Sequence, residues 1–132
     1  MKKPPSTTLP CPCGGPTLQT CCGRFLGGET APDAAALMRS RYTAYVLDDR
    51  AHLLATWHPS TRPAGIAAPE PGLTWLGLEV RRQIEQDADH ATVEFVARSK
   101  LGGRAHRLHE LSRFVREGNC WFYLDGEFPA DL

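Results

Sequence analysis

The stretch CPCGGPTLQTCC, residues 11–22, holds four of the five cysteines of this chain. Cys11 and Cys13 stand one residue apart, and the chain returns seven residues later to the adjacent pair Cys21 and Cys22. A disulfide between adjacent cysteines closes a strained ring. A one-residue gap also differs from the two-residue gap of thioredoxin-like redox sites. The spacing therefore favours a shared metal ion over either form of sulfur–sulfur chemistry.

Length and composition bound the rest of the chain. With 132 residues and 42% hydrophobic residues, the chain is long enough for one domain with its own core and a short appended module. Lys plus Arg and Asp plus Glu both number 15, so no net charge favours binding to nucleic acid or to an anionic membrane surface. The opening MKKPPSTTLP, residues 1–10, lacks the apolar region of a secretory signal and is predicted to be disordered. We expect a cytoplasmic protein with no membrane association.

The reducing cytoplasm makes a metal site the leading interpretation of the cysteines, because structural disulfides are rare there. A tetrahedral thiolate site needs four sulfurs about 2.3 Å from one zinc ion. Pro12, Gly14 and Gly15 make the required sharp bend easy, since proline presets φ and glycine tolerates positive φ. Redox-active or incidental thiols are the alternative. The sequence predicts one structural Zn²⁺ per chain, bound by Cys11, Cys13, Cys21 and Cys22.

Two helices are predicted after the cysteine-rich segment, which we call the knuckle, residues 11–28. Asp33 opens the first helix, in which apolar residues recur at helical spacing as far as Val46. The acidic pair 48–49 starts a second, short helix that carries Trp57. This helix should end at His58, because the proline that follows disfavours helical geometry there.

Beyond a proline-rich loop over residues 59–72 the hydrophobic period changes to two, which is typical of strands. The short sequences EQDAD, LGG and EGN between the strands are turn-forming. The predicted strands are LTWLGLEVRRQI, ATVEFVARSK, AHRLHELSRFVRE and CWFYLD. Residues 29–132 are therefore expected to form an α+β domain of two helices followed by four antiparallel strands, with the helices on one sheet face.

Several stretches together resemble a known family. CPCG, a short loop and CC resemble the SEC-C motif, the zinc knuckle also found at the C-terminus of the SecA translocation ATPase. LMRSRYTAYVLDD, TWHPS, WLGL, VEFVAR and SRFVREGNCWFYLDG resemble the bacterial YchJ family over nearly all of residues 10–127. The resemblance implies a cone-shaped, nuclear-transport-factor-two-like fold, in which a curved sheet and helices enclose a pocket.

Two charged residues are candidates for the wall of such a pocket. Arg41 interrupts the apolar stripe of the first helix, and a buried guanidinium needs a carboxylate or several acceptors. Glu110 lies on the inward-facing side of its predicted strand and is the expected partner. The alternatives are a purely structural ion pair between Arg41 and Glu110 and, for His58, a role in pinning the neighbouring loop. The predicted pocket residues are Arg41, Tyr45, Trp57, His58 and Glu110.

The leading functional hypothesis is a protein-interaction or adaptor module, in which the knuckle contacts an unidentified protein partner. The comparison with SecA adds that SEC-C knuckles can contact proteins such as the SecB chaperone. The alternative is a small-ligand-binding or enzymatic domain that uses the pocket. A deep pocket with polar groups would favour this alternative, whereas a plugged pocket and an exposed apolar knuckle face would favour the adaptor. The predicted interaction surface is Leu18, Arg24, Phe25 and Leu26.

Overall fold

The computed structural model describes residues 9–129, so the predicted disordered segment 1–10 falls almost wholly outside the described residues. Three helices come first within this range, namely α1 (Cys22–Leu26), α2 (Ala34–Leu47) and α3 (Arg50–Ala55). The strands β1 (Thr74–Asp87), β2 (His90–Leu101), β3 (Arg104–Glu117) and β4 (Cys120–Glu127) follow. They pair antiparallel in the order β1-β2-β3-β4. The predicted α+β class is confirmed, and α1, inside the knuckle, is an additional helix.

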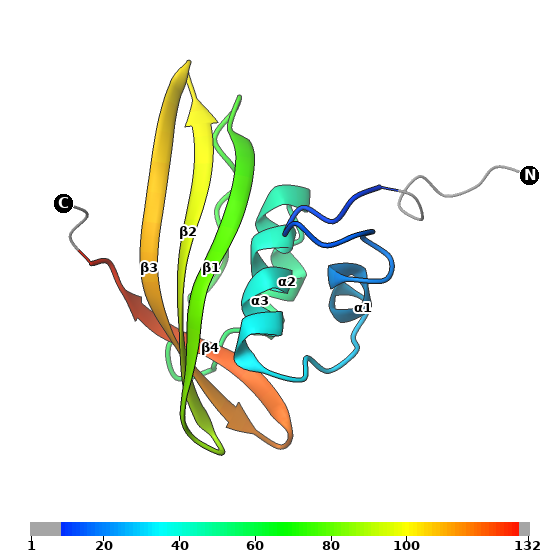
Figure 1. Cartoon of the computed structure of the whole chain (residues 1–132), viewed down its shortest axis with the longest axis vertical. Helices are drawn as coiled ribbons and strands as arrows, with labels where there is room; N and C mark the ends of the chain where they lie inside the picture. The colour runs from blue at the N-terminus through cyan, green and yellow to red at the C-terminus, as the bar shows by residue number, and fades with distance from the viewer. Residues whose placement is uncertain (1–8, 130–132) are drawn as a thin grey trace, which may run out of the picture.

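The elements form layers (Figure 1). Helix α2 lies against one face of the twisted sheet, α3 packs against α2, and α1 lies on the side of α2 that faces away from the sheet. None of the helices in residues 9–129 is long and apolar enough to cross a membrane. Helix α2 is thus the central element, with the knuckle on one side and the sheet on the other.

Side-chain caps set the boundaries of α2 and α3. The Asp33 carboxylate accepts a hydrogen bond from the backbone N–H of Ala36 at 2.8 Å, which caps the N-terminus of α2. Asp48 ends the helix in the left-handed conformation, with φ 59°. The next residue, Asp49, caps α3 by accepting from the N–H of His52 at 3.1 Å. The acidic pair therefore separates the two helices, as the sequence predicts.

Helix α3 is shorter than predicted and ends at Ala55 rather than at His58. The backbone N–H of Tyr123 in β4 donates to Thr56 O, and the N–H of His58 donates to Tyr123 O, both at 2.8 Å. Trp57 forms a parallel bridge with Tyr123 between these two bonds. Pairing with β4 holds this segment in an extended conformation. Helix α3 therefore ends before the position at which the following proline would end it. Such a long-range partner is not visible in the local sequence.

Hairpin turns link the strands within the predicted turn sequences, although β1 continues to Asp87, through the first three residues of EQDAD. Gly102 and Gly103 connect β2 to β3 with φ of 59° and 77°, and Gly118 and Asn119 connect β3 to β4 with φ of 58° and 66°. Two consecutive positive φ values are characteristic of type I′ turns, whose twist matches that of the flanking strands. The turn between β2 and β3 fixes the register that brings Phe95 opposite Glu110.

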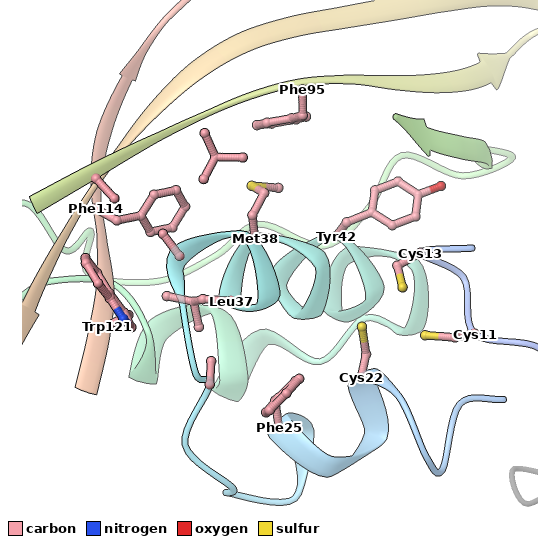
Figure 2. Close-up of a cluster of buried hydrophobic side chains, with 14 of the residues drawn as sticks. Cys11, Cys13, Cys22, Phe25, Leu37, Met38, Tyr42, Phe95, Phe114 and Trp121 are labelled. Carbon is pink, nitrogen blue, oxygen red and sulfur yellow. The ribbon is translucent and has the colours of Figure 1, made fainter. Parts of the chain in front are cut away.

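One hydrophobic core extends from the sheet through α2 into the knuckle. Inward-facing residues of β2 and β3, such as Phe95 and Phe114, pack with Met38 and Tyr42 of α2. Figure 2 shows the same cluster continuing past α2 to Phe25 and to the cysteines of the knuckle. The knuckle is therefore packed as part of the domain and not as a separate module.

Candidate metal centre and central cavity

The four knuckle cysteines converge on one point. A turn closed by a hydrogen bond from Gly14 N–H to Cys11 O, at 3.0 Å, presents the first two, while the other two lie at the start of α1. All four Sγ atoms lie within 4.8 Å of one another, and those of Cys13 and Cys21 are 3.5 Å apart. Sulfurs placed tetrahedrally about 2.3 Å from one zinc ion would be about 3.8 Å apart. The cluster has the dimensions of a four-thiolate metal site and could hold a metal ion.

The thiols strongly influence one another. A hydrogen bond from the Cys22 thiol lowers the pKa of Cys13 to about 5, and the same contact raises the pKa of Cys22. Burial and the neighbouring thiols raise the pKa of Cys21 to about 11. In the absence of a cation, the cluster stabilises the thiolate of Cys13 and makes deprotonation of Cys21 and Cys22 less favourable. A bound metal ion removes this penalty by favouring all four thiolates.

Neighbouring residues hold the sulfurs in place. Thr43, from the centre of α2, places Oγ1 3.7 Å from Cys11 Sγ in a buried contact. The backbone N–H of Gly15 donates to Cys13. A Cβ atom at Gly15 would lie only 2.5 Å from Cys21 Sγ, and one at Gly23 only 2.6 Å from Leu18 O. Both glycines are therefore required by close packing around the cluster.

Two of the four residues of the predicted interaction surface of the knuckle are buried. Leu18 and Phe25 are 8% and 6% exposed, because both join the core beneath α2 (Figure 2 shows Phe25 pointing towards α2). The prediction that they offer an exposed apolar face is wrong. Arg24 is exposed and is held by a hydrogen bond to Cys21 O at 3.0 Å, while Leu26 is half-buried.

A cavity of about 270 Å³ lies between α2 and the sheet. Four of the five predicted pocket residues line it, namely Arg41, Tyr45, Trp57 and Glu110. The other lining residues are Met38, Tyr42, Trp75, Phe95, Ala97, Leu108, Ser112 and Tyr123. Tyr45 and Leu108 are each 39% exposed and mark the side on which the cavity opens.

Arg41 is 3% exposed, and its guanidinium lies against two aromatic rings that are also in contact with each other. Its guanidinium carbon lies 5.0 Å from the ring centre of Trp57 and 4.5 Å from that of Tyr123. Its Nη1 donates to Leu53 O at 2.9 Å and to Thr56 Oγ1 at 2.7 Å. Burial lowers the pKa of Arg41 to about 10, so the side chain remains a cation at neutral pH.

The predicted direct pair between Arg41 and Glu110 does not form among the described residues. Instead, Glu110 Oε2 accepts from Ser112 Oγ at 2.7 Å and from the hydroxyl of Tyr123 at 2.9 Å. Tyr123 thus joins the two charges, its ring against the cation and its hydroxyl on the carboxylate. Burial, followed by the charge of Glu110, raises the pKa of Tyr123 well above its usual range, so the hydroxyl stays protonated and donates.

Sequence reasoning misses Tyr123, although a signal for it exists. Period-two alternation in CWFYLD places Tyr123 on the same face as Trp121, which is buried. Gly126, on the same strand, also escapes notice. A Cβ atom there would collide with Glu110 Oε2, so the close approach of β4 needs glycine at this position.

The fifth predicted pocket residue, His58, lies outside the cavity lining, because the chain turns away after pairing with β4. Its Nδ1 lies 2.7 Å from Ser60 Oγ, and its Nε2 lies 3.0 Å from Glu117 Oε2. Its ring also packs edge-on against Phe122. These contacts fasten the start of the proline-rich loop to the sheet. The placement of His58 at the pocket is wrong, and the loop-pinning alternative describes it.

The structure joins a four-cysteine cluster to a helix-and-sheet domain that contains a cavity. This combination is that of a protein with a SEC-C-like N-terminal segment and a nuclear-transport-factor-two-like domain. The family model described as "YchJ, middle NTF2-like domain" matches residues 33–126, and the chain belongs to the YchJ family.

Relatives and solved structures agree with this assignment. A UPF0225 protein of Methylibium petroleiphilum is 68% identical over 94% of this chain and 92% of its own. A UPF0225 protein of Bordetella parapertussis is 54% identical over 96% of this chain and 98% of its own. The solution structure of a SEC-C motif-containing protein from Rhodopseudomonas palustris superposes with a TM-score of 0.80 at 31% identity, covering 92% of this chain and 100% of that one. The crystal structure of a SEC-C motif-containing protein from Psychrobacter arcticus gives 0.77 at 27% identity, covering 96% and 86%.

Proposed function

We propose that the four cysteines hold one structural Zn²⁺ and that the central cavity is the functional site, where a small molecule binds. The convergence of four sulfurs within 4.8 Å supports the metal. Zinc accepts a tetrahedral four-thiolate site, and such a site leaves no position open for water or substrate. The similar structures described as SEC-C motif-containing proteins are consistent with this role. We also propose a cytoplasmic location, because reducing conditions keep the thiols available to the metal.

Metal analysis tests the zinc proposal. Protein purified without added metal should contain one zinc per chain, and Cys13→Ser should lose it. Cys120→Ser is the matched control, since Cys120 is exposed at the start of β4 and lies outside the cluster. Zinc-free protein with four reactive knuckle thiols would overturn the proposal.

The observation that supports a ligand-binding cavity is the burial of its two charged residues. Arg41 and Glu110 are 3% and 7% exposed, and burying such groups is costly unless their polar atoms are satisfied. The cavity is open and holds these polar groups, while the apolar residues Leu18 and Phe25 of the knuckle are covered. Of the two functions considered from the sequence, this arrangement favours the ligand-binding domain.

Filling the cavity tests this function. Ala97 is buried and lines the cavity, so Ala97→Leu should occupy much of the ligand space. Native mass spectrometry of the zinc-bound protein from bacterial cells should show a co-purifying small molecule that the variant lacks. The zinc content of the variant confirms that it is folded. A wild-type protein that carries no small molecule and is not stabilised by any compound in a fragment screen would refute the proposal.

A protein-interaction role of the knuckle is the second candidate, favoured by the exposed Arg24 next to the half-buried Leu26. Arginine is enriched among residues that dominate interface energies. Arg24→Ala should then weaken capture of a protein partner while zinc stays bound. Arg81→Ala, an exposed arginine on β1, serves as the control. Equal capture by wild type and Arg24→Ala would exclude this candidate.

A further inference from the structure

The two charged residues of the cavity are only partly satisfied by the protein. Arg41 donates through Nη1, and in the described part of the chain its Nε and Nη2 have no acceptor. Glu110 accepts through Oε2, and its Oε1 has no donor within the same residues. None of these atoms is among the fully buried side-chain atoms that lack a partner. For side chains this deeply buried, the accessible space is the cavity that they line.

The charges in the cavity balance. Arg41 supplies one positive charge, and Glu110, which lies near this cation and accepts hydrogen bonds from Ser112 and Tyr123, supplies one negative charge as a carboxylate. No other Lys, Arg, His, Asp or Glu side chain lines the cavity among the described residues. A charged ligand would therefore add an uncompensated charge between largely apolar walls, which is unfavourable. A neutral ligand avoids this cost.

The rest of the wall is largely aromatic. Six rings line the cavity, those of Tyr42, Tyr45, Trp57, Trp75, Phe95 and Tyr123. Aromatic rings favour offset or edge-to-face contact with other rings. Tyr42 and Trp75 already make an edge-on pair, with ring centres 5.6 Å apart. The volume of about 270 Å³ is at the lower end of ligand pockets, which suits a molecule of one ring or two.

We infer that the cavity binds a small, uncharged, planar molecule that presents a hydrogen-bond acceptor beside a donor, as an aromatic amide or a lactam ring does. The acceptor of the ligand accepts hydrogen bonds from the free N–H groups of Arg41. The donor of the ligand donates a hydrogen bond to the free oxygen of Glu110. The rings on the cavity wall pack against the planar body. This inference rests on the proposed ligand-binding function and names the chemical class of the ligand.

Three probes of one shape and different charge test the class. Benzamide is neutral with an acceptor beside a donor, benzoate is an anion, and benzylamine is a cation at neutral pH. Titration calorimetry on the full zinc-bound chain should show benzamide binding at least about tenfold more tightly than either charged probe. Tighter binding of benzoate or benzylamine would overturn the class while leaving the ligand-binding function intact.

Changing the charge of the cavity should change the preference. Glu110→Gln removes the negative charge, keeps the size of the side chain and leaves Arg41 uncompensated, so benzoate should become the preferred probe. Glu85→Gln, on an exposed part of β1, should keep the preference for benzamide. An unchanged preference in Glu110→Gln would overturn the inference. If no probe binds while a co-purified molecule fills the cavity, the inferred class alone is wrong. If no probe binds and no co-purified molecule is found, both the inferred class and the ligand-binding function are wrong.

Discussion

Gly15 shows how one residue can control the proposed metal centre without being a ligand. A Cβ atom at this position would lie 2.5 Å from Cys21 Sγ, well inside van der Waals contact. We predict that Gly15→Ala displaces Cys21 and weakens zinc binding by about 10- to 100-fold, as is typical of changes to the residues that support metal ligands. Competition with a chromophoric chelator measures the affinity. Gly65→Ala is the control, because nothing lies within 4 Å of its Cβ position, and it should bind zinc like the wild type.

Tyr123 is the residue that joins the two buried charges. Tyr123→Phe keeps the ring against Arg41 but removes the hydroxyl that donates to Glu110 Oε2 at 2.9 Å. A buried carboxylate that loses one of its donors should destabilise the fold by about 1–3 kcal/mol. Urea denaturation measures the free energy of unfolding. The matched change Tyr45→Phe affects an exposed ring and should cost much less, so equal losses in the two variants would contradict this account.

At the scale of elements, α2 connects the two candidate sites. Arg41 and Thr43 are two residues apart and so point about 200° apart around the helix axis. One reaches the cavity and the other reaches Cys11. Most of the helix between Ala34 and Ala44 is buried, which is typical of a helix covered on several sides. A change in α2 should therefore affect both sites.

The contact between α2 and α3 predicts a pH dependence of stability. His52 Nε2 lies 2.9 Å from Ser40 Oγ, and burial lowers the pKa of His52 below its ordinary value of 6.5. Arg41 acts in the same direction, whereas Asp49 opposes it. Below pH 6.5 the unfolded chain binds a proton at this histidine that the folded protein does not. The free energy of unfolding should therefore fall as the pH decreases from 6.5 towards the lowered pKa of the folded state.

Urea denaturation at pH 7.5 and pH 5.5 measures this dependence. His52→Gln should lose less stability between the two pH values than the wild type does, since glutamine does not titrate. His106→Gln changes an exposed histidine and should behave like the wild type. A wild-type pH dependence in His52→Gln would show that other groups are responsible.

For the whole molecule, the shared core alters what metal removal should do. The knuckle has almost no apolar residues of its own. If it were packed as a separate module, metal chelation would unfold the knuckle and leave the rest of the domain folded. In the structure, Leu18, Cys22 and Phe25 belong to the same core as Leu37 and Met38 of α2. Zinc removal should therefore lower the stability of the domain as well as disorder the knuckle.

Amide hydrogen exchange with and without a chelator tests this coupling. Protection should fall in residues 11–26 and also in α2, with a smaller loss in the central strands β2 and β3. Protection of α2 that is unchanged by chelation would contradict the coupling. The modular alternative would then be correct.

Local sequence determined the elements of this fold because their signals are local. Asp33, the acidic pair 48–49, the Gly102–Gly103 turn and the period-two strands act within a few residues, and the structure places the elements accordingly. The cysteine spacing likewise predicts that the four sulfurs converge, because twelve residues with sharp bends cannot carry them far apart. The resemblance to the YchJ family added the nuclear-transport-factor-two-like domain, which the comparisons confirm.

Only the tertiary structure decided which residues meet across the sheet and which are covered. Backbone pairing with Tyr123 shortened α3 and turned His58 away from the cavity, and the hydroxyl of Tyr123 took the place expected for the Arg41 guanidinium at Glu110. Packing against α2 buried Leu18 and Phe25. Each of these outcomes depends on a partner distant in the chain, because burial and pairing are properties of the assembled core and not of any local pattern.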